Sequence, residues 1–273
     1  MPASRHSYIL GSGDSEFDRL AHQHEVWRDT TERLWDLAGF GPDQRLVDLA
    51  CGPGFTSFEL AERAGPGGHV VAVDNSDRFL GALDSWRKER CINNLSTRLA
   101  DASDLGLPAD SADGVFVRWL LCFLPDPSQV IQEAARVLAP GGRLVVMDYF
   151  HYLAIQLFPE SSQFRHVFQK VYESFADSGG SLDVASGVPV FMAQAGLEVT
   201  HVESLGVVAR PGEPVWGWVR AFQKNYLPQL VEQGYLSPFE LQAFEDDWLA
   251  HEQHTESLFY SPPMLGVIGR KPG

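Results

Sequence analysis

The chain is poor in cysteine and in positive charge. It has 3 cysteines in 273 residues, and 21 lysines and arginines against 36 aspartates and glutamates. The cysteines, Cys51, Cys91 and Cys122, are widely spaced and odd in number, which favours neither a disulfide framework nor a zinc site and predicts reduced thiols in a cytoplasmic protein. The net charge of −15 repels phosphate backbones and lipid headgroups, so nucleic acid is not expected as a partner.

Long apolar runs are also missing. The first 17 residues lack the apolar stretch of a signal peptide, and the most apolar run, residues 144–158, is interrupted by Asp148, His151 and Gln156. We therefore expect no membrane insertion. The composition, 44% hydrophobic and 21% charged, is that of a globular protein with a sizeable core.

Between residues 45 and 148 the chain alternates between two apolar patterns. Short strand-like runs, RLVDLA, HVVAVD, DGVFVRW and GRLVVMDYF, are separated by the helical patterns FELAERA, FLGALDSWRKER and VIQEAARVL. Such alternation predicts parallel strands joined by crossover helices, which is an α/β fold with a doubly wound sheet. Two further strands are expected at 197–207 and 264–270.

The remaining segments have helical spacing of apolar residues. We divide the chain into an N-terminal helical cover at 1–40, a cofactor-binding core at 41–150, a helical insertion at 151–196, and the rest of the sheet at 197–273 with a second insertion at 214–256. Both insertions begin where strands end. We expect these helices to cap the carboxyl edge of the sheet, where open α/β sheets bind ligands.

The segment Val47–Gly54 runs from an apolar strand into a glycine turn and a helix. Gly52 and Gly54 allow a ligand to approach the backbone, and the helix start offers amide groups and a positive dipole end. Asp74 closes the next strand, where a carboxylate can accept hydrogen bonds from ribose hydroxyls. This spacing indicates a nucleotide-type site.

A dinucleotide site is the alternative, and two positions disfavour it. Ser57 stands where the third glycine of G-x-G-x-x-G is needed, and Pro53 separates the first two glycines. An NAD-dependent oxidoreductase therefore remains a weaker hypothesis.

The segment VDLACGPG resembles the first motif of class I S-adenosylmethionine-dependent methyltransferases, with Ala50 in place of the motif's first glycine. The resemblance continues in order through VVAVDNSDRFL, LADASDLGLP, DGVFVRWLLCFLPDP and VLAPGGRLVVMDY. It implies a Rossmann-like, mostly parallel sheet of seven strands, with S-adenosyl-L-methionine as cofactor. Residues 8–27 are similar to the opening of a bacterial small-molecule branch related to ubiquinone and menaquinone biosynthesis methyltransferases.

The resemblance implies a role for each matched position. Residues of the glycine turn would line the methionine part of the cofactor: Ala50, Cys51, Gly52 and Gly54. The ribose would be held by Asp74 with Asn75 beside it, and the adenine by Phe79, Asp101 and Ala102. Three further residues would approach from the fourth strand and the N-terminal segment: Arg118, Tyr8 and Gln23.

A methyl group on a sulfonium is already activated, so the protein mainly aligns a nucleophile and excludes water, and no metal is expected. An oxygen or carbon acceptor can require a general base, whereas an amine can attack directly. Candidates after the fifth strand are Asp148, Tyr149, His151 and Tyr152. We favour His151, because its ordinary pKa is near neutral, with Tyr149 second.

Aromatic residues predict a pocket for a small aromatic or apolar metabolite. We expect Trp119, Tyr152 and Trp216 to line it, since Trp216 lies off the helical stripe that contains Trp218 and Tyr226. The predicted activity is methyl transfer to an oxygen, nitrogen or carbon atom. The alternatives are an S-adenosylmethionine-binding protein without methylation and the oxidoreductase, and the sequence leaves a homodimer open.

Overall fold

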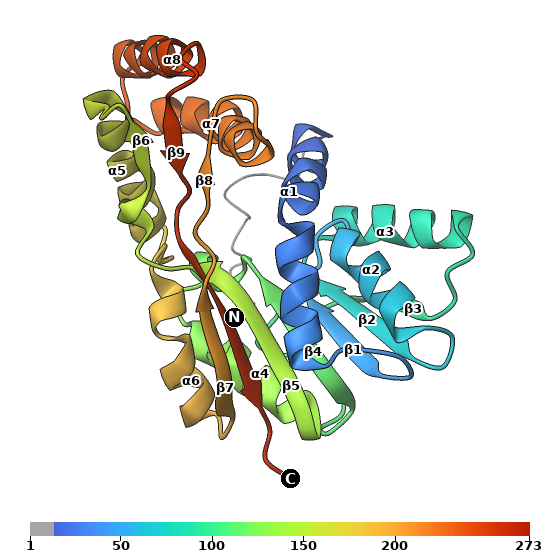
Figure 1. Cartoon of the computed structure of the whole chain (residues 1–273). Helices are drawn as coiled ribbons and strands as arrows, with labels where there is room; N and C mark the ends of the chain where they lie inside the picture. Colours follow the sequence, from blue (N-terminus) through green and yellow to red (C-terminus); the bar gives the residue numbers. More distant parts are fainter. Residues whose placement is uncertain (1–13) are drawn as a thin grey trace.

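The computed structural model describes residues 14–273 and contains a seven-stranded sheet in the order β3-β2-β1-β4-β5-β10-β7 (Figure 1). Strand β10 runs antiparallel to β5 and β7, and the pairings among β1 to β5 are parallel. The predicted doubly wound, mostly parallel sheet of seven strands is therefore confirmed. The strands are β1 Arg45–Leu49, β2 His69–Asp74, β3 Leu95–Leu99, β4 Ala112–Arg118, β5 Leu138–Tyr149, β7 Glu198–Ser204 and β10 Met264–Arg270.

The central strands are apolar on both faces because helices cover both faces. Val115, Phe116 and Val117 of β4 are fully buried, as are Leu144 to Met147 of β5. The chain leaves β1 outward through β2 and β3 and then returns to β4 on the other side of β1. This reversal opens a crevice at the carboxyl ends of β1 and β4, which is where such sheets bind ligands.

Helices α1, α2 and α3 pack on one face of the sheet and α4 and α6 on the other (Figure 1). Their bounds are α1 Asp14–Ala38, α2 Phe55–Ala64, α3 Asp77–Glu89, α4 Pro127–Val137 and α6 Val188–Gln194. Two glycines of strand β10 show how closely the helices on the two faces approach the sheet. A Cβ at Gly266 would lie 2.5 Å from Leu34 of α1, and one at Gly269 would lie 2.7 Å from Met192 of α6.

A third group of elements, here named the helical layer, lies beyond the end of the sheet where β5 ends (Figure 1). It consists of α5 Ser162–Asp177, α7 Pro214–Glu232, α8 Pro238–Glu252 and a small antiparallel sheet of β6 Gln156–Phe158, β9 Leu258–Tyr260 and β8 Val208–Ala209. The three helices were expected from their apolar spacing. The small sheet was not, because strands of two or three residues are too short to show alternation.

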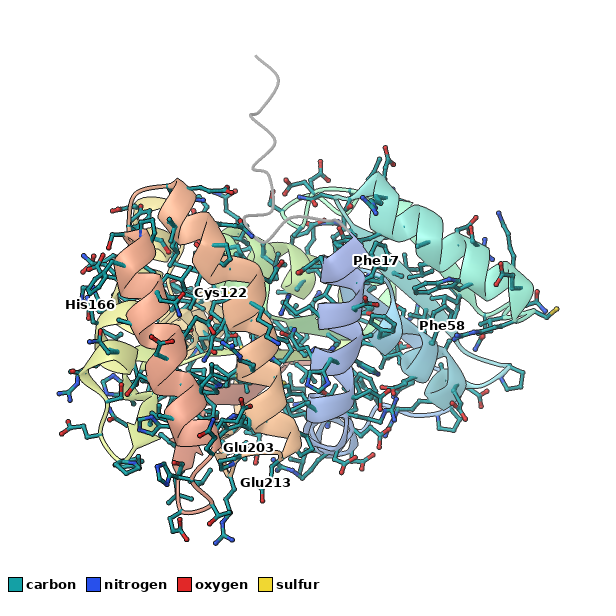
Figure 2. The ribbon with its side chains drawn as sticks, turned by 90° about the horizontal axis from the view of Figure 1, so that it is seen from above. Phe17, Phe58, Cys122, His166, Glu203 and Glu213 are labelled. Atoms are coloured by element: carbon teal, nitrogen blue, oxygen red, sulfur yellow. The ribbon has the colours of Figure 1, made fainter. Side chains whose placement is uncertain are left out.

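The insertion expected at 151–196 is divided between two places. Helix α5 joins the helical layer, whereas α6 packs against β7 and β10 on the face of the sheet. Seen from above, α1 lies between α7 and α8 on one side and α2 and α3 on the other, with Phe17 on α1 and Phe58 on α2 (Figure 2). None of the helices within residues 14–273 is long and apolar enough to cross a membrane.

Candidate functional site

The glycine turn after β1 contains three residues in the left-handed region: Ala50 at φ 57°, Gly52 at φ 53° and Gly54 at φ 89°. A Cβ at Gly54 would lie 2.0 Å from the side chain of Leu83, so only glycine fits there. A Cβ at Gly52 would meet no atom of residues 14–273 within 4 Å. The backbone at Gly52 is therefore open to the close approach of a ligand.

Asp74, at the end of β2, holds this turn in place. Its Oδ2 accepts a hydrogen bond from the amide of Gly52 at 2.8 Å, and its Oδ1 accepts one from the amide of Ser76 at 2.9 Å. Burial raises the pKa of Asp74, and these backbone donors counteract the rise. Each carboxylate oxygen has a second lone pair, so Asp74 retains the capacity to accept from ribose hydroxyls.

Asp48 fixes the start of α2 to strand β1. Its buried Oδ2 accepts from the hydroxyls of Thr56 at 2.8 Å and Ser57 at 2.5 Å. Burial raises the pKa of Asp48, and the two hydroxyls lower it in part. Ser57 therefore has a bonding role at the position where a dinucleotide fingerprint needs glycine. The residue before α2 is Gly54, which has no side chain to bond the first amide groups of the helix.

Arg118, the last residue of β4, points its side chain toward α1. Its guanidinium donates to the Thr31 hydroxyl at 3.0 Å, lies 3.4 Å from Nδ1 of His24 and sits 5.0 Å from the centre of the Trp119 ring. Burial lowers the pKa of Arg118 to about 10, and the charge of Asp48 opposes this shift. The predicted contact with the cofactor is through the Arg118 backbone and stays a prediction.

The residues predicted to meet the nucleoside lie just after β2 and β3, with Phe79 in the first turn of α3. Phe79 is buried, with its ring 5.1 Å from that of Phe17 on α1. Asn75 and Asp101 are exposed, Ala102 is half-buried, and Oδ1 of Asp101 accepts from the amide and hydroxyl of Ser103. The structure thus brings these positions to the same edge as the glycine turn, with Cys51 buried in that turn.

Of the two residues predicted from the N-terminal segment, Tyr8 lies outside the described residues. Gln23 lies on α1, where its Oε1 accepts from Arg19 at 2.9 Å and from the indole Nε1 of Trp218 at 3.1 Å. Gln23 therefore connects α1 to α7.

Aromatic rings gather between α1, α7 and the ends of β4 and β5, and we name them the aromatic wall: Trp27, Trp119, Tyr149, Tyr152 and Trp218. Trp119 lies 6.4 Å from Tyr149, which lies 5.2 Å from Tyr152. Trp218 stacks at 6.3 Å on Trp119. Sequence analysis placed Trp218 in a core stripe and missed its contact with Trp119, because no local pattern shows which helix face meets a distant strand end.

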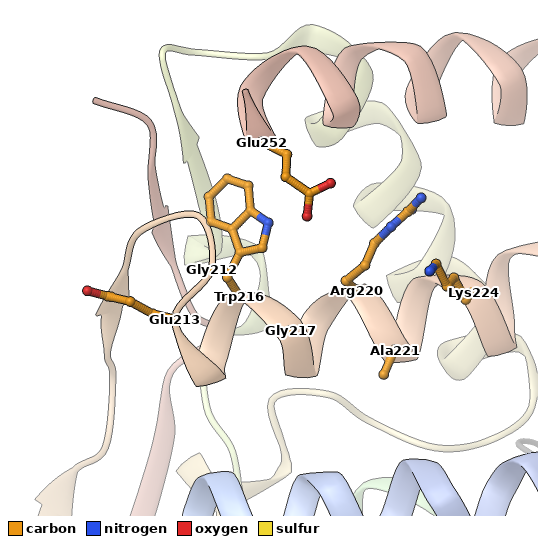
Figure 3. A pocket seen from close by; sticks show the side chains of 8 residues that line it. All are labelled: Gly212, Glu213, Trp216, Gly217, Arg220, Ala221, Lys224 and Glu252. Atoms are coloured by element: carbon orange, nitrogen blue, oxygen red, sulfur yellow. The ribbon is translucent and has the colours of Figure 1, made fainter. Parts of the chain in front are cut away.

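The expectation that Trp216 shares this space with Trp119 is wrong. Residues 216 and 218 are roughly 200° apart around a helix, so their side chains leave α7 in nearly opposite directions. Trp216 packs 4.7 Å from Trp248 and 6.3 Å from Phe259, inside the helical layer. It lines a separate cavity of about 270 Å³ with Arg220, Lys224 and Glu252 among its neighbours (Figure 3).

The candidate proton acceptors at the end of β5 and just after it differ in environment. Asp148 is fully buried and accepts from the amides of Leu121 at 2.9 Å, Cys122 at 3.3 Å and Tyr149 at 2.8 Å. Burial raises the pKa of Asp148 to about 6 and that of Tyr149 well above its usual range. His151 is exposed, with its backbone in the left-handed region at φ 51°. Within residues 14–273 no group of three His, Cys, Asp or Glu side chains is placed to hold a metal ion.

Comparison with known families agrees with this geometry. Residues 47–146 match the family model described as "Methyltransferase domain". This segment contains the glycine turn and strands β2, β3 and β4, so the part of the chain that shapes this edge of the sheet is similar to methyltransferase domains.

Individual relatives share this part of the chain. Nocamycin O-methyltransferase of Saccharothrix syringae is 38% identical over 133 residues, which are 47% of this chain and 48% of that enzyme. Demethylmenaquinone methyltransferase of Lactococcus lactis subsp. lactis (strain IL1403) is 34% identical over 149 residues, 52% of this chain and 58% of that enzyme. The chain therefore matches about half the length of these relatives.

One solved structure with a similar fold is named for a different reaction. The [4+2]-cyclase SpnF superposes with a TM-score of 0.58 at 17% identity, covering 89% of this chain and 80% of that one. Identity at this level shows the fold alone, so the reaction has to be argued from the site.

Proposed function

We propose that the protein transfers a methyl group from S-adenosyl-L-methionine to a small aromatic or apolar metabolite. The observation that carries the proposal is the hydrogen bond between Asp74 and the amide of Gly52, at the carboxyl ends of β2 and β1 inside the matched domain. This bond joins the open glycine turn to the carboxylate that would hold a ribose. The NAD alternative is not favoured, because Ser57 is bonded to Asp48 where a glycine would be required.

The residues at the crevice fit the cofactor. Gly52 leaves open space at the turn, Asp74 has unused lone pairs for the ribose, and Phe79 offers an apolar surface for the adenine. Ala50, Cys51 and Gly54 are proposed to line the methionine end, with Asn75, Asp101 and Ala102 at the nucleoside and Arg118, Gln23 and Tyr8 closing the site. When bound, the cofactor supplies an activated methyl group, and the protein orients the acceptor and excludes water.

The acceptor is proposed to bind at the aromatic wall, with Trp119 and Tyr152 among its contacts. The ordinary pKa of a tyrosine hydroxyl is far above neutral pH and burial raises that of Tyr149 further, so Tyr149 keeps its proton and can orient an acceptor oxygen by donating a hydrogen bond. His151 is proposed as the group that removes a proton from an oxygen or carbon acceptor. The capping role of the helical layer is part of the same proposal.

Asp74→Ala tests the cofactor site directly. We expect the dissociation constant for S-adenosylhomocysteine to rise about tenfold or more, about 1.4 kcal/mol, because charge-assisted bonds to the ribose are lost. Isothermal calorimetry would measure it. Asp77→Ala removes an exposed carboxylate three residues further on and should leave the constant unchanged. Equal binding by wild type and Asp74→Ala would refute the assignment.

His151→Ala tests the proposed base. Turnover should fall by roughly a hundredfold, the low end of acid–base contributions, while the affinity for the cofactor stays the same. A fully active variant would remove His151 from the mechanism.

The remaining expectations concern the cellular location of the protein, its binding to nucleic acid and its oligomeric state. A cytoplasmic location is supported by three cysteines that are all free thiols. The absence of a nucleic-acid partner is supported by the net charge of −15. Whether the protein forms a homodimer is open to light-scattering measurement of its mass in solution.

A further inference from the structure

A cavity of about 610 Å³ lies between α1, α2 and α3, and we name it the three-helix cavity. None of the described residues that line it belongs to the aromatic wall or is proposed to contact the cofactor. Its volume lies within the range of small-molecule sites, roughly 300–1,000 Å³, whereas the cavity beside Trp216 is smaller, at about 270 Å³. The three-helix cavity is therefore large enough for a ligand of its own.

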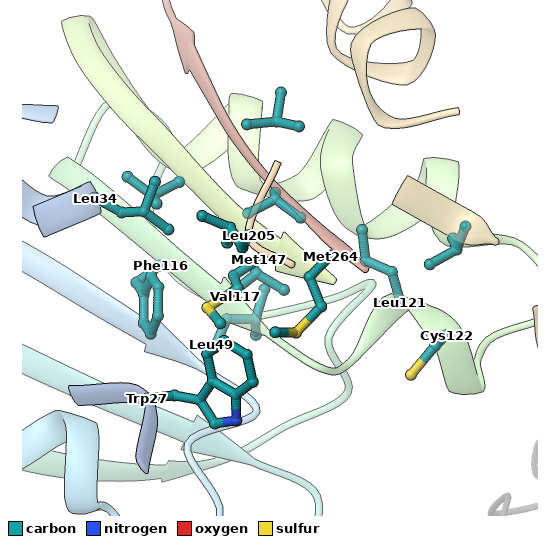
Figure 4. Packing of buried hydrophobic residues seen from close by; sticks show 14 of the residues in the cluster. Trp27, Leu34, Leu49, Phe116, Val117, Leu121, Cys122, Met147, Leu205 and Met264 are labelled. Carbon is teal, nitrogen blue, oxygen red and sulfur yellow. The ribbon is translucent and has the colours of Figure 1, made fainter. Parts of the chain in front are cut away.

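Each of the three helices contributes one aromatic ring to the cavity. Trp86 of α3 lies 6.1 Å from Phe17 of α1 and 6.0 Å from Phe55 of α2. Figure 2 shows Phe17 at the end of α1 beside α3. The three rings are half-buried, whereas core side chains such as Phe116 and Leu49 are fully enclosed by their neighbours (Figure 4). An apolar ligand in the cavity would cover the exposed parts of these rings, which is favourable in water.

Small side chains leave the cavity open. The residues of α3 and its C-terminal cap that line it recur every four positions, so they share one face of the helix: Arg78, Ala82, Trp86 and Arg90. Ala82 on this face and Ala21 on α1 have only a methyl group. A longer side chain at position 82 would therefore extend into the cavity.

Arg90 supplies a positive charge at one end of this face. Its guanidinium lies 4.9 Å from the centre of the Phe58 ring and forms no ion pair with any of residues 14–273. Arg87 and Lys88, in the same turn, both pair with Asp84. Arg90 is therefore the cation of this turn that can bind an anionic group.

Two further charged residues border the cavity. Arg78 lies at the other end of the α3 face, 5.7 Å from the centre of the Phe17 ring, and Asp18 lies on α1. The lining thus has two arginines against one aspartate, in a chain whose net charge is −15. The local excess of positive charge favours an anion over a neutral or cationic ligand.

We propose that the three-helix cavity binds a flat aromatic carboxylate as a second ligand of the protein. The aromatic part packs against Trp86 and Phe55, and the carboxylate pairs with the guanidinium of Arg90, whose parallel N–H groups match two carboxylate oxygens. The site goes beyond the proposed function and does not depend on it, because it uses none of the residues assigned to the cofactor or the methyl acceptor.

The charge of the ligand is tested with 2-naphthoate and 2-naphthamide, which share a ring system and differ in charge. Binding to the purified full chain is measured by equilibrium dialysis. The wild-type protein should bind 2-naphthoate about threefold to fivefold more tightly than 2-naphthamide, the upper range for an exposed ion pair. Arg90→Gln should remove this preference. Lys88→Gln removes a positive charge from the same turn outside the cavity and should keep it.

The location of the ligand is tested by filling the cavity. Ala82→Leu should weaken the binding of both probes at least about tenfold, because the longer side chain occupies the space of the ring. Ser85→Leu adds the same side chain at an exposed position of α3 outside the cavity and should bind both probes as the wild type does.

Four results would overturn the inference. They are no saturable binding of 2-naphthoate to the wild-type protein, equal affinity for the two probes, unchanged binding in Ala82→Leu, and loss of the charge preference in Lys88→Gln or Arg78→Gln with Arg90→Gln unaffected. Unchanged binding in Ala82→Leu would place the probe elsewhere in the protein. Since Arg90→Gln changes an exposed residue, it keeps the inference testable even where Ala82→Leu does not fold.

Discussion

The carboxyl ends of the sheet strands are held in place by hydrogen bonds to carboxylates, whereas the helical layer is held together by packing of aromatic rings. At the strand ends, buried or half-buried carboxylates each accept two or more hydrogen bonds from backbone amides or hydroxyls: Asp48, Asp74 and Asp148. In the helical layer, aromatic rings from α5, α7, α8 and β9 pack on one another: Phe164, Phe168, Trp216, Phe244, Trp248 and Phe259. Hydrogen bonds are directional and fix a loop in one geometry, whereas ring packing tolerates many arrangements.

This difference suits the proposed function, in which the cofactor is the same in every reaction of this kind and the methyl acceptor differs from one enzyme to another. A cofactor of fixed structure needs a turn held at fixed positions, which Asp48 and Asp74 provide. In the proposed function, an acceptor pocket bordered by helices would change shape through the residues that pack there. The comparison predicts that changes in the helical layer affect stability and leave cofactor binding intact.

The largest effect is expected for Trp248→Ala in the helical layer. Trp248 is fully buried and contacts Trp216 at 4.7 Å, so its loss leaves a cavity and should lower the free energy of unfolding by about 3–5 kcal/mol. Chemical denaturation would measure it. Phe239→Ala on the same helix removes a ring that is 81% exposed and should change stability by less than about 0.5 kcal/mol. Weaker S-adenosylhomocysteine binding by the folded Trp248→Ala protein would break the comparison.

Asp148→Asn tests the carboxylates at the strand ends. The amide has one accepting oxygen for three backbone donors, so the free energy of unfolding should fall by about 1–3 kcal/mol at pH 7.

The difference in the free energy of unfolding between the wild type and Asp148→Asn should increase as the pH falls. Burial raises the pKa of Asp148 to about 6 in the folded protein, above its value of 3.8 in the unfolded chain. The folded state therefore binds the proton more tightly, and wild-type stability gains about 1 kcal/mol relative to Asp148→Asn as pH falls from 7 to 5. Denaturation of both proteins at the two pH values would show the widening gap, and a constant gap would contradict the burial of this carboxylate.

The smallest effect is expected for Ala50→Gly in the glycine turn. Ala50 has a left-handed backbone at φ 57°, which strains a residue with a Cβ. Glycine relieves that strain but adds freedom to the unfolded chain, so we expect a net gain of about 0.5 kcal/mol. Ala82→Gly within α3 should instead lose about 1 kcal/mol. A loss of stability in Ala50→Gly would mean that the alanine methyl group makes contacts that outweigh the strain.

The sequence predicted those parts of the structure that are determined by a few neighbouring residues. The strand–turn–helix pattern around Gly52 and the acidic end of β2 are each contained in a few neighbouring residues, so the sheet and the cofactor edge could be predicted. Ala50 was noted as a departure from the family motif, and the structure shows it in the conformation that glycine favours.

The acceptor side could not be predicted in the same way, because it depends on contacts between distant segments. Whether Trp216 or Trp218 faces Trp119 is decided by the rotation of α7 against α1, and the spacing within one helix contains no information on that rotation. The small sheet of β6, β8 and β9 was missed because its strands are too short to form a pattern.

The central claim is that the glycine turn and Asp74 form a site for S-adenosyl-L-methionine. Isothermal calorimetry of the purified protein with S-adenosylmethionine, S-adenosylhomocysteine and NAD in parallel tests it without knowledge of the acceptor. The account predicts micromolar binding of both adenosyl ligands and none of NAD. Binding of NAD alone, or of no ligand, would contradict it.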